Sequence, residues 1–219
     1  MRENEEVPET LAPINWILVH GNPRSGTGLM ARIISHACRR YVGDWGLRNL
    51  LREVTGNINA KFDKHQLLKD ISSNILANAQ ATNGGQFDLV FKQAVLTEGE
   101  YKVLEYIWGK PAKTVYCFRS PDEYIHSAIL KFVNSDELQL TKLYENQMKR
   151  FRGIGGHCFE YHAKLTTHDY LNFLAPIKIE NDSLEIFAHK GVSDRSNVTP
   201  KMWEVYEELL ENVKLNVMA

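Results

Sequence analysis

The stretch from His20 to Ile34, HGNPRSGTGLMARII, places a glycine-rich loop between an apolar run and a helical pattern. The preceding residues 14–20, INWILVH, are almost continuously apolar, which is typical of a short strand buried on both faces. After the loop, apolar residues recur at helical spacing from Leu29 to Tyr41, so we expect a helix there. Strand, loop and helix in this order form the first half of a βαβ unit.

Strand and helix patterns continue to alternate along the chain. We expect further strands around Val42, at Phe87–Val95, at Lys113–Phe118 and in residues 157–163. Start signals predict helices after Asp63, Thr97, Ser120 and Thr199, and one from Ser135 to Phe151. This alternation predicts an α/β protein with a three-layer P-loop-type fold, in which helices flank a mostly parallel central sheet.

The length of 219 residues fits one domain. Residues 1–13 are polar and acidic, and we expect them to be a flexible leader rather than a signal peptide. Residues 14–219 are expected to form a single domain. The sequence shows no internal repeat and no low-complexity tract.

Charge and cysteine content restrict the function classes. The formal net charge is −1, which gives no general attraction to nucleic acid or to an anionic membrane, so an anion site must be local. No apolar stretch approaches the ~20 residues of a membrane span. The 3 cysteines are far apart and form no CxxC pair, and the histidines lack metal-ligand spacing. We expect a cytoplasmic protein with no metal site.

The loop shares only part of the Walker pattern. Gly21 and Gly26 have the GxxxxG spacing, but Thr27 and Gly28 stand where lysine and a hydroxyl residue should follow. A P-loop kinase or NTPase would therefore lack both its phosphate lysine and its magnesium hydroxyl. Arg24 instead supplies a permanent cation within the loop, so the loop can hold a tetrahedral anion without a metal. The alternative is a plain strand-to-helix turn with a surface arginine.

The segment GNPRSGTGLMARII resembles the 5′-phosphosulfate-binding loop of the sulfotransferases, which use 3′-phosphoadenosine 5′-phosphosulfate as sulfuryl donor. The family pattern, G-x-P-(Lys or Arg)-S-G-T-T, is matched through Thr27 and broken at Gly28, where the family has a second threonine. The resemblance implies a sulfotransferase-like domain over residues 14–219, and adenosine 3′,5′-bisphosphate as product. It implies donor binding by Arg24, Ser25, Gly26, Thr27 and Gly28.

Two later segments extend the resemblance. The family holds the 3′-phosphate through an arginine that ends a strand and a serine eight residues later, which here are Arg119 and Ser127. Arg119 follows a predicted parallel strand, at the sheet edge where α/β folds bind ligands. The alternative is a local ion pair of Arg119 with Asp122 or Glu123. Near the C-terminus, the match to a basic-Lys-Gly loop that also reaches the 3′-phosphate falls on residues 189–191, namely His189, Lys190 and Gly191.

Sulfuryl transfer depends on positioning and on neutralising the leaving phosphate oxygen. Arg24 is the candidate to neutralise the charge on that oxygen. Lys92 matches an active-site lysine of the family, so the resemblance implies that it lies near the same oxygen. Ala94 stands where the family has a strand histidine, so the identity of the base that deprotonates the acceptor is open. Asp44 is the first choice, with His65 and Glu98 in reserve, and a turn role for Asp44 is the alternative.

Three functions remain open. The leading one is a small sulfotransferase acting on a hydroxyl or amine of a small molecule, saccharide or peptide. The others are a P-loop kinase or NTPase and a non-catalytic nucleotide-binding module on the same fold. The short chain implies abbreviated acceptor loops, with either an open site or a lid supplied by a second subunit in a homodimer.

Overall fold

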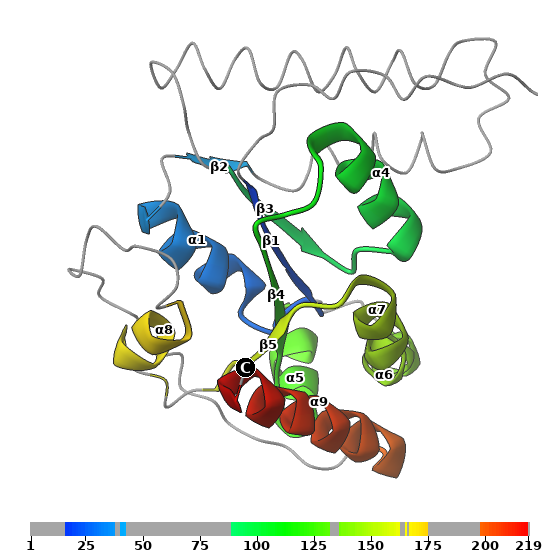
Figure 1. Cartoon of the computed structure of the whole chain (residues 1–219). Helices are drawn as coiled ribbons and strands as arrows, with labels where there is room; N and C mark the ends of the chain where they lie inside the picture. The colour runs from blue at the N-terminus through cyan, green and yellow to red at the C-terminus, as the bar shows by residue number, and fades with distance from the viewer. Residues whose placement is uncertain are drawn as a thin grey trace, which may run out of the picture.

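A computed structural model describes residues 16–37, 40–42, 89–131, 136–162, 165, 167–174 and 198–218. Its centre is a parallel sheet with the strand order β2-β3-β1-β4-β5. The strands are β1 (Trp16–Gly21), β2 (Arg40–Val42), β3 (Leu89–Ala94), β4 (Lys113–Phe118) and β5 (His157–Glu160). The first strand therefore lies in the middle of the sheet, between β3 and β4 (Figure 1).

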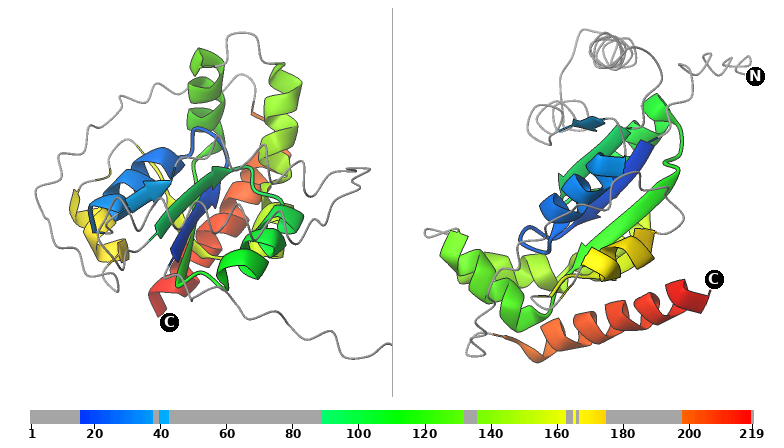
Figure 2. Two further views of the ribbon diagram at one scale, coloured as in Figure 1. Left: turned by 90° about the horizontal axis from the view of Figure 1, so that it is seen from above. Right: turned by 90° about the vertical axis from the view of Figure 1, so that its left-hand side faces the viewer.

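Helices cover both faces of the sheet and give three layers (Figure 2). On one face lie α1 (Thr27–Ala37) and α8 (Thr167–Leu174). On the other lie α4 (Glu98–Trp108), α5 (Pro121–Lys131), α6 (Glu137–Glu145), α7 (Gln147–Ile154) and α9 (Pro200–Met218). The fold is thus α/β, with a parallel sheet flanked by helices, as the alternating sequence pattern predicts.

The central strand explains why its sequence is apolar throughout. All six residues of β1 are buried. Ile17 and Val19 pack into a core with α1, whereas the alternate residues face the other helical layer, where the ring of Trp16 packs on Trp108 of α4. A second core on this layer joins β4 and β5 to α5, α6, α7 and α9. A strand buried on both faces must be apolar on both, because side chains alternate between the faces.

Three predicted helix starts are confirmed, two of them with their capping chemistry. Thr97 caps α4: its hydroxyl accepts from the backbone N–H of Glu100, and the Glu100 carboxylate accepts from the Thr97 N–H at 2.8 Å. The next helix, α5, begins at Pro121. Before α9, the Thr199 hydroxyl accepts from the N–H of Met202 at 3.3 Å. Each cap satisfies backbone donors that the first helical turn leaves unpaired.

The prediction of one helix from Ser135 to Phe151 is wrong. The chain forms α6 and α7, which meet at Asn146 with φ −89° and ψ 3°. The Asn146 side-chain amide donates to the carbonyl of Lys142 at 2.8 Å, so the residue closes one helix before the next begins. Asp136 caps α6 by accepting from the N–H of Leu138 at 2.9 Å. The helix α8 was not predicted, and the helix expected after Asp63 lies outside the described residues.

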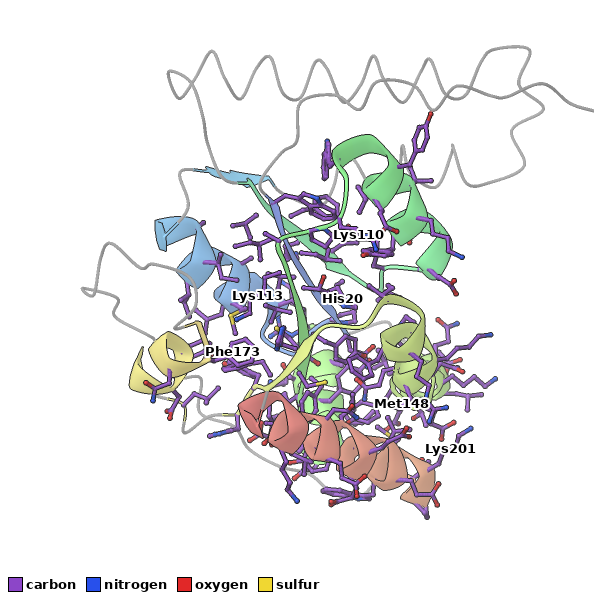
Figure 3. All side chains as sticks on the ribbon, viewed as in Figure 1. His20, Lys110, Lys113, Met148, Phe173 and Lys201 are labelled. Carbon is purple, nitrogen blue, oxygen red and sulfur yellow. The ribbon has the colours of Figure 1, made fainter. Side chains whose placement is uncertain are left out.

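His20 is a buried polar residue at the end of β1, on the side of the sheet that carries α7 (Figure 3). Its Nε2 lies 2.9 Å from the carbonyl oxygen of Gly155, and its ring packs edge-on against Tyr116 at 4.9 Å. A carbonyl can only accept, so Nε2 carries the proton of a neutral ring. Burial lowers the pKa of His20 from its ordinary value near 6.5 to about 4, and the nearby charge of Arg150 acts in the same direction.

This histidine makes folding sensitive to acid. Between pH 6.5 and pH 4 the unfolded chain binds a proton at residue 20 that the folded chain cannot accept, so stability falls as the pH drops through this range. Integrated over the shift, the loss is on the order of 3 kcal/mol. We expect urea unfolding of the His20→Gln variant to lose this part of the pH dependence.

The control is His126→Gln, which replaces a histidine on α5 and leaves His20 in place. It should keep the full acid sensitivity of the unmodified protein. An identical slope of stability against pH in the unmodified protein and in His20→Gln would reject this role for His20.

Candidate functional site

The loop from Asn22 to Gly26 leaves the carboxyl end of β1 and leads into α1. Gly21, just before it, has φ 146°, and a Cβ there would lie 2.0 Å from the carbonyl oxygen of Cys117 on β4. Gly26 has φ 79°, and a Cβ there would lie 2.5 Å from the ring of Tyr161. Glycine is therefore required at both positions by contact as well as by conformation.

The start of α1 is an uncompensated positive end. The first turn of this helix contains no acidic residue, whereas the first turns of α4 and α5 each contain two. The N–H groups of a first turn have no partner within their helix, and the helix dipole adds a partial positive charge. An anion at the loop would satisfy both.

Arg24 reaches from this loop to α5. Its Nε donates to the hydroxyl oxygen of Ser127 at 3.1 Å, across 103 residues of sequence. Arg24 is exposed and has φ 66°, a left-handed conformation that costs a non-glycine residue about 1 kcal/mol. The side chain of Arg24 is thus held toward α5, the helix that carries Ser127, which is predicted to bind the 3′-phosphate.

Arg119 follows β4 directly and is only 5% exposed. Its Nη1 donates to the carbonyl of Arg24 at 3.3 Å, and its guanidinium lies 4.9 Å from the centre of the Tyr161 ring. The hydroxyl of Tyr144 donates to the Arg119 carbonyl at 2.6 Å. These contacts hold the strand-end arginine against the loop.

Arg119 also makes the local ion pair that the sequence left as an alternative. Its Nε lies 2.7 Å from a carboxylate oxygen of Glu123, one turn into α5. The ion pair and the contact with the loop are made at the same time, because Nε faces Glu123 while Nη1 faces the loop. The Glu123 contact orients the guanidinium and leaves part of its donor set for another acceptor.

The topology explains why these segments meet. β1 and β4 are neighbouring parallel strands, so their carboxyl ends lie at the same edge. The helix after β1 covers one face and the helix after β4 covers the other. The two loops therefore diverge from a single point, which is where open α/β sheets bind ligands.

Two buried residues with hydroxyl groups, one in the loop and one at the start of α1, belong to the candidate site. Ser25 is fully buried, and its Oγ has no hydrogen-bond partner within the described part of the chain. Thr27 is 5% exposed at the start of α1. A buried hydroxyl without a partner costs free energy, so Ser25 is suited to donate to a bound oxyanion. Gly28 has open space around the position of a Cβ.

The described residues include few of the predicted catalytic groups. Lys92 lies on β3 in register with Val19 and is half-buried. Glu98 lies at the exposed start of α4, where a hydrogen bond from Lys102 lowers the pKa of its carboxyl and weakens it as a base. Asp44, His65, His189, Lys190 and Gly191 lie outside the described residues.

The structure adds three site residues that the sequence did not indicate. Asn22 is fully buried in the loop and accepts a hydrogen bond from Arg150 of α7. Tyr161 follows β5 and packs between Gly26 and Arg119. Tyr161 had one usable signal, since it lies in the stretch 157–163 in which a strand was predicted. Arg150 had none, because its helix was predicted with the wrong bounds.

In the described segments, no three His, Cys, Asp or Glu side chains gather in a way that could hold a metal ion. Within the same segments, no helix combines the length and apolar character that crossing a membrane requires.

Comparison with known proteins gives a structural match only. No family model matches the chain, and no curated protein matches it. The sulfotransferase domain of the olefin synthase from Synechococcus PCC 7002 matches with a TM-score of 0.54 and 12% identity, over 95% of this chain and 98% of that domain. A second match, to APE1195, has a TM-score of 0.30 at 16% identity over 93% of this chain and 97% of that chain, too low to support an argument. The chain is therefore similar in fold to a sulfotransferase domain.

Proposed function

We propose that the chain is a sulfotransferase that moves the sulfuryl group of 3′-phosphoadenosine 5′-phosphosulfate to a hydroxyl or amine acceptor. The observation that carries this proposal is the hydrogen bond from Arg24 to Ser127. It joins the two segments predicted to bind the 5′- and 3′-phosphates, at one edge of the sheet. The similarity in fold to a sulfotransferase domain supports it.

The two ends of the donor have separate candidate partners. The loop residues Ser25, Gly26 and Thr27 and the start of α1 would hold the 5′-phosphosulfate. Arg119 and Ser127 would hold the 3′-phosphate, because a guanidinium and a hydroxyl suit a phosphate monoester. Ser127 accepts from Arg24 and still has its own proton to donate. The resemblance adds His189, Lys190 and Gly191 to this second phosphate.

The proposed reaction requires little covalent chemistry from the protein. The acceptor oxygen or nitrogen forms a bond to sulfur while the bond from sulfur to the 5′-phosphate oxygen breaks, and negative charge grows on that oxygen. Arg24 would neutralise this charge, together with the Ser25 hydroxyl and the positive end of α1. Lys92, from the neighbouring strand β3, is the further candidate cation. The acceptor's proton would pass to Asp44 or, failing that, His65, an assignment that rests on the sequence alone.

The loop has neither the lysine nor the magnesium-binding hydroxyl that a kinase or NTPase uses, since Thr27 and Gly28 occupy those positions. A non-catalytic module would bind the same nucleotide and transfer nothing. Small molecules, saccharides and peptides all remain acceptor classes for the proposed enzyme.

Nucleotide choice tests the proposal directly. We expect adenosine 3′,5′-bisphosphate to raise the melting temperature without magnesium, because a ligand that binds only the folded state stabilises it. Arg24→Ala and Arg119→Ala should each weaken binding by about tenfold or more, since each removes a charge-assisted hydrogen bond to phosphate. A thermal shift assay measures the melting temperature, and isothermal titration calorimetry measures the affinity of each variant.

Arg32→Ala is the matched control, because Arg32 is an exposed arginine on α1. It should bind the bisphosphate as the unmodified protein does. Stabilisation by ATP and magnesium, but not by the bisphosphate, would overturn the proposal in favour of a kinase or NTPase. Binding without transfer from radiolabelled donor to any acceptor in a broad panel would indicate a non-catalytic module.

Gly28 allows a gain-of-function test. A Cβ at this position meets no atom within 4 Å, so a threonine fits and restores the second hydroxyl of the family pattern. We expect Gly28→Thr to tighten bisphosphate binding by about threefold to tenfold, the range of one added ordinary hydrogen bond. Calorimetric titration of the variant measures the change.

Gly99→Thr is its control. Gly99 is also the second residue of a helix, α4, and also has open space around its Cβ position. Both substitutions change helix propensity alike, but only position 28 borders the loop. Equal effects of the two variants on affinity would show that Gly28 does not face the anion.

A further inference from the structure

Arg150 of α7 lies against the loop from the side opposite to α1. Its Nη2 donates to the side-chain oxygen of Asn22, and to the carbonyl of Leu143 at 2.7 Å. It also lies near His20, whose pKa its charge lowers. Arg150 is thus a third arginine beside the loop, 128 residues from the position it contacts.

No carboxylate neutralises Arg150 among the residues that the structure describes. Its hydrogen-bond partners are an amide oxygen and a backbone carbonyl. Burial lowers the pKa of its guanidinium, and the phenols of Tyr116 and Tyr124 are the other groups that act on it. By contrast, Arg119 pairs with Glu123, and Arg152, on the same helix, pairs with Glu208.

A partly buried guanidinium without a counter-charge is costly. Such a charge is retained where something else neutralises it. The loop beside it is already a candidate for a doubly charged ligand, so the missing negative charge and the expected ligand belong to the same place.

Asn22 gives an independent sign of a ligand. The residue is fully buried, and its oxygen is taken by Arg150. The amide nitrogen, Nδ2, has no acceptor among the described residues, and neither does the Ser25 hydroxyl three positions later. Two donors without a partner in one loop indicate an acceptor that the described residues do not supply.

We infer that Arg150 is a positioning residue of the anion site: it fixes the Asn22 amide so that Nδ2 donates to the bound anion, and its unpaired charge attracts that anion. The identity of the anion as the 5′-phosphosulfate group rests on the proposed function. The charge argument itself needs only an oxyanion at the loop.

This role separates affinity from stability. If Arg150 only held the fold together, its loss would lower both. If its charge serves the ligand, removing Arg150 removes an unpaired charge from the empty protein and so does not destabilise it, whereas binding of the anion becomes weaker. Affinity should then fall without a matching fall in stability.

The experiment uses the full chain, with adenosine 3′,5′-bisphosphate titrated by calorimetry and stability measured by urea unfolding without ligand. We expect Arg150→Gln to weaken binding by about tenfold or more, because one positive charge near the 5′-phosphate of the bisphosphate is lost. Its urea midpoint should be unchanged or higher. Arg152→Gln removes an equal charge from the exposed face of the same helix and should change neither quantity.

Asn22→Asp is the second variant, and its two effects should have opposite signs. An aspartate of the same shape pairs with Arg150 and removes the orphaned Nδ2, so the urea midpoint should rise. The same carboxylate neutralises Arg150 and repels the ligand, so affinity should fall by about tenfold or more.

The outcomes separate this inference from the proposed function. If the unmodified protein does not bind the bisphosphate, the proposed function fails. If it binds, and Arg150→Gln and Asn22→Asp bind equally well, the role of Arg150 is overturned while the proposed function stands. Parallel losses of affinity and of stability in both variants would also overturn the inference, since they would mark a purely structural residue.

Discussion

The site depends on how closely β1 and β4 approach at their carboxyl ends. A side chain at Gly21 would place its Cβ 2.0 Å from the Cys117 carbonyl, so only glycine allows the loop to leave the sheet there. Because the helices that follow these two strands cover opposite faces, both loops open from the same edge. The strand pairing alone thus brings Arg24 and Arg119 together, and the contact from Nη1 of Arg119 to the Arg24 carbonyl holds them in place.

The arginines are fixed by their surroundings more than by each other. The Tyr161 ring fills the space that a side chain at Gly26 would need, and the guanidinium of Arg119 packs on the same ring. Arg24 keeps a left-handed backbone, at a cost that the contact with Ser127 helps to offset. If the loop binds an anion as proposed, a loop built in this way would need little rearrangement, and the entropic cost of binding would be low.

The parts that the sequence predicted well are set by local chemistry. The capping box at Thr97 and the apolar run of β1 each act within a few residues, and both are found as predicted. The pairing of Arg119 with Glu123 is also local, one helical turn apart. Arg150 and Tyr161 could not be found in this way, because their roles depend on which elements pack together. The break between α6 and α7 was missed because Asn146, which closes the first helix, is also compatible with a helix interior.

The distribution of charge explains how a loop without the Walker lysine can hold an anion. A lysine brings one mobile cation to the phosphates, whereas here the charge is supplied by residues fixed on separate elements. Within the described segments, Arg24 and Arg150 lack a carboxylate partner, and the start of α1 lacks an acidic residue. These three features leave positive potential concentrated at one edge of a chain whose formal net charge is −1. No carboxylate in the described segments relieves that local excess. If the loop binds an anion as proposed, the bound anion would relieve it, and part of the binding affinity would then come at the expense of the stability of the empty protein.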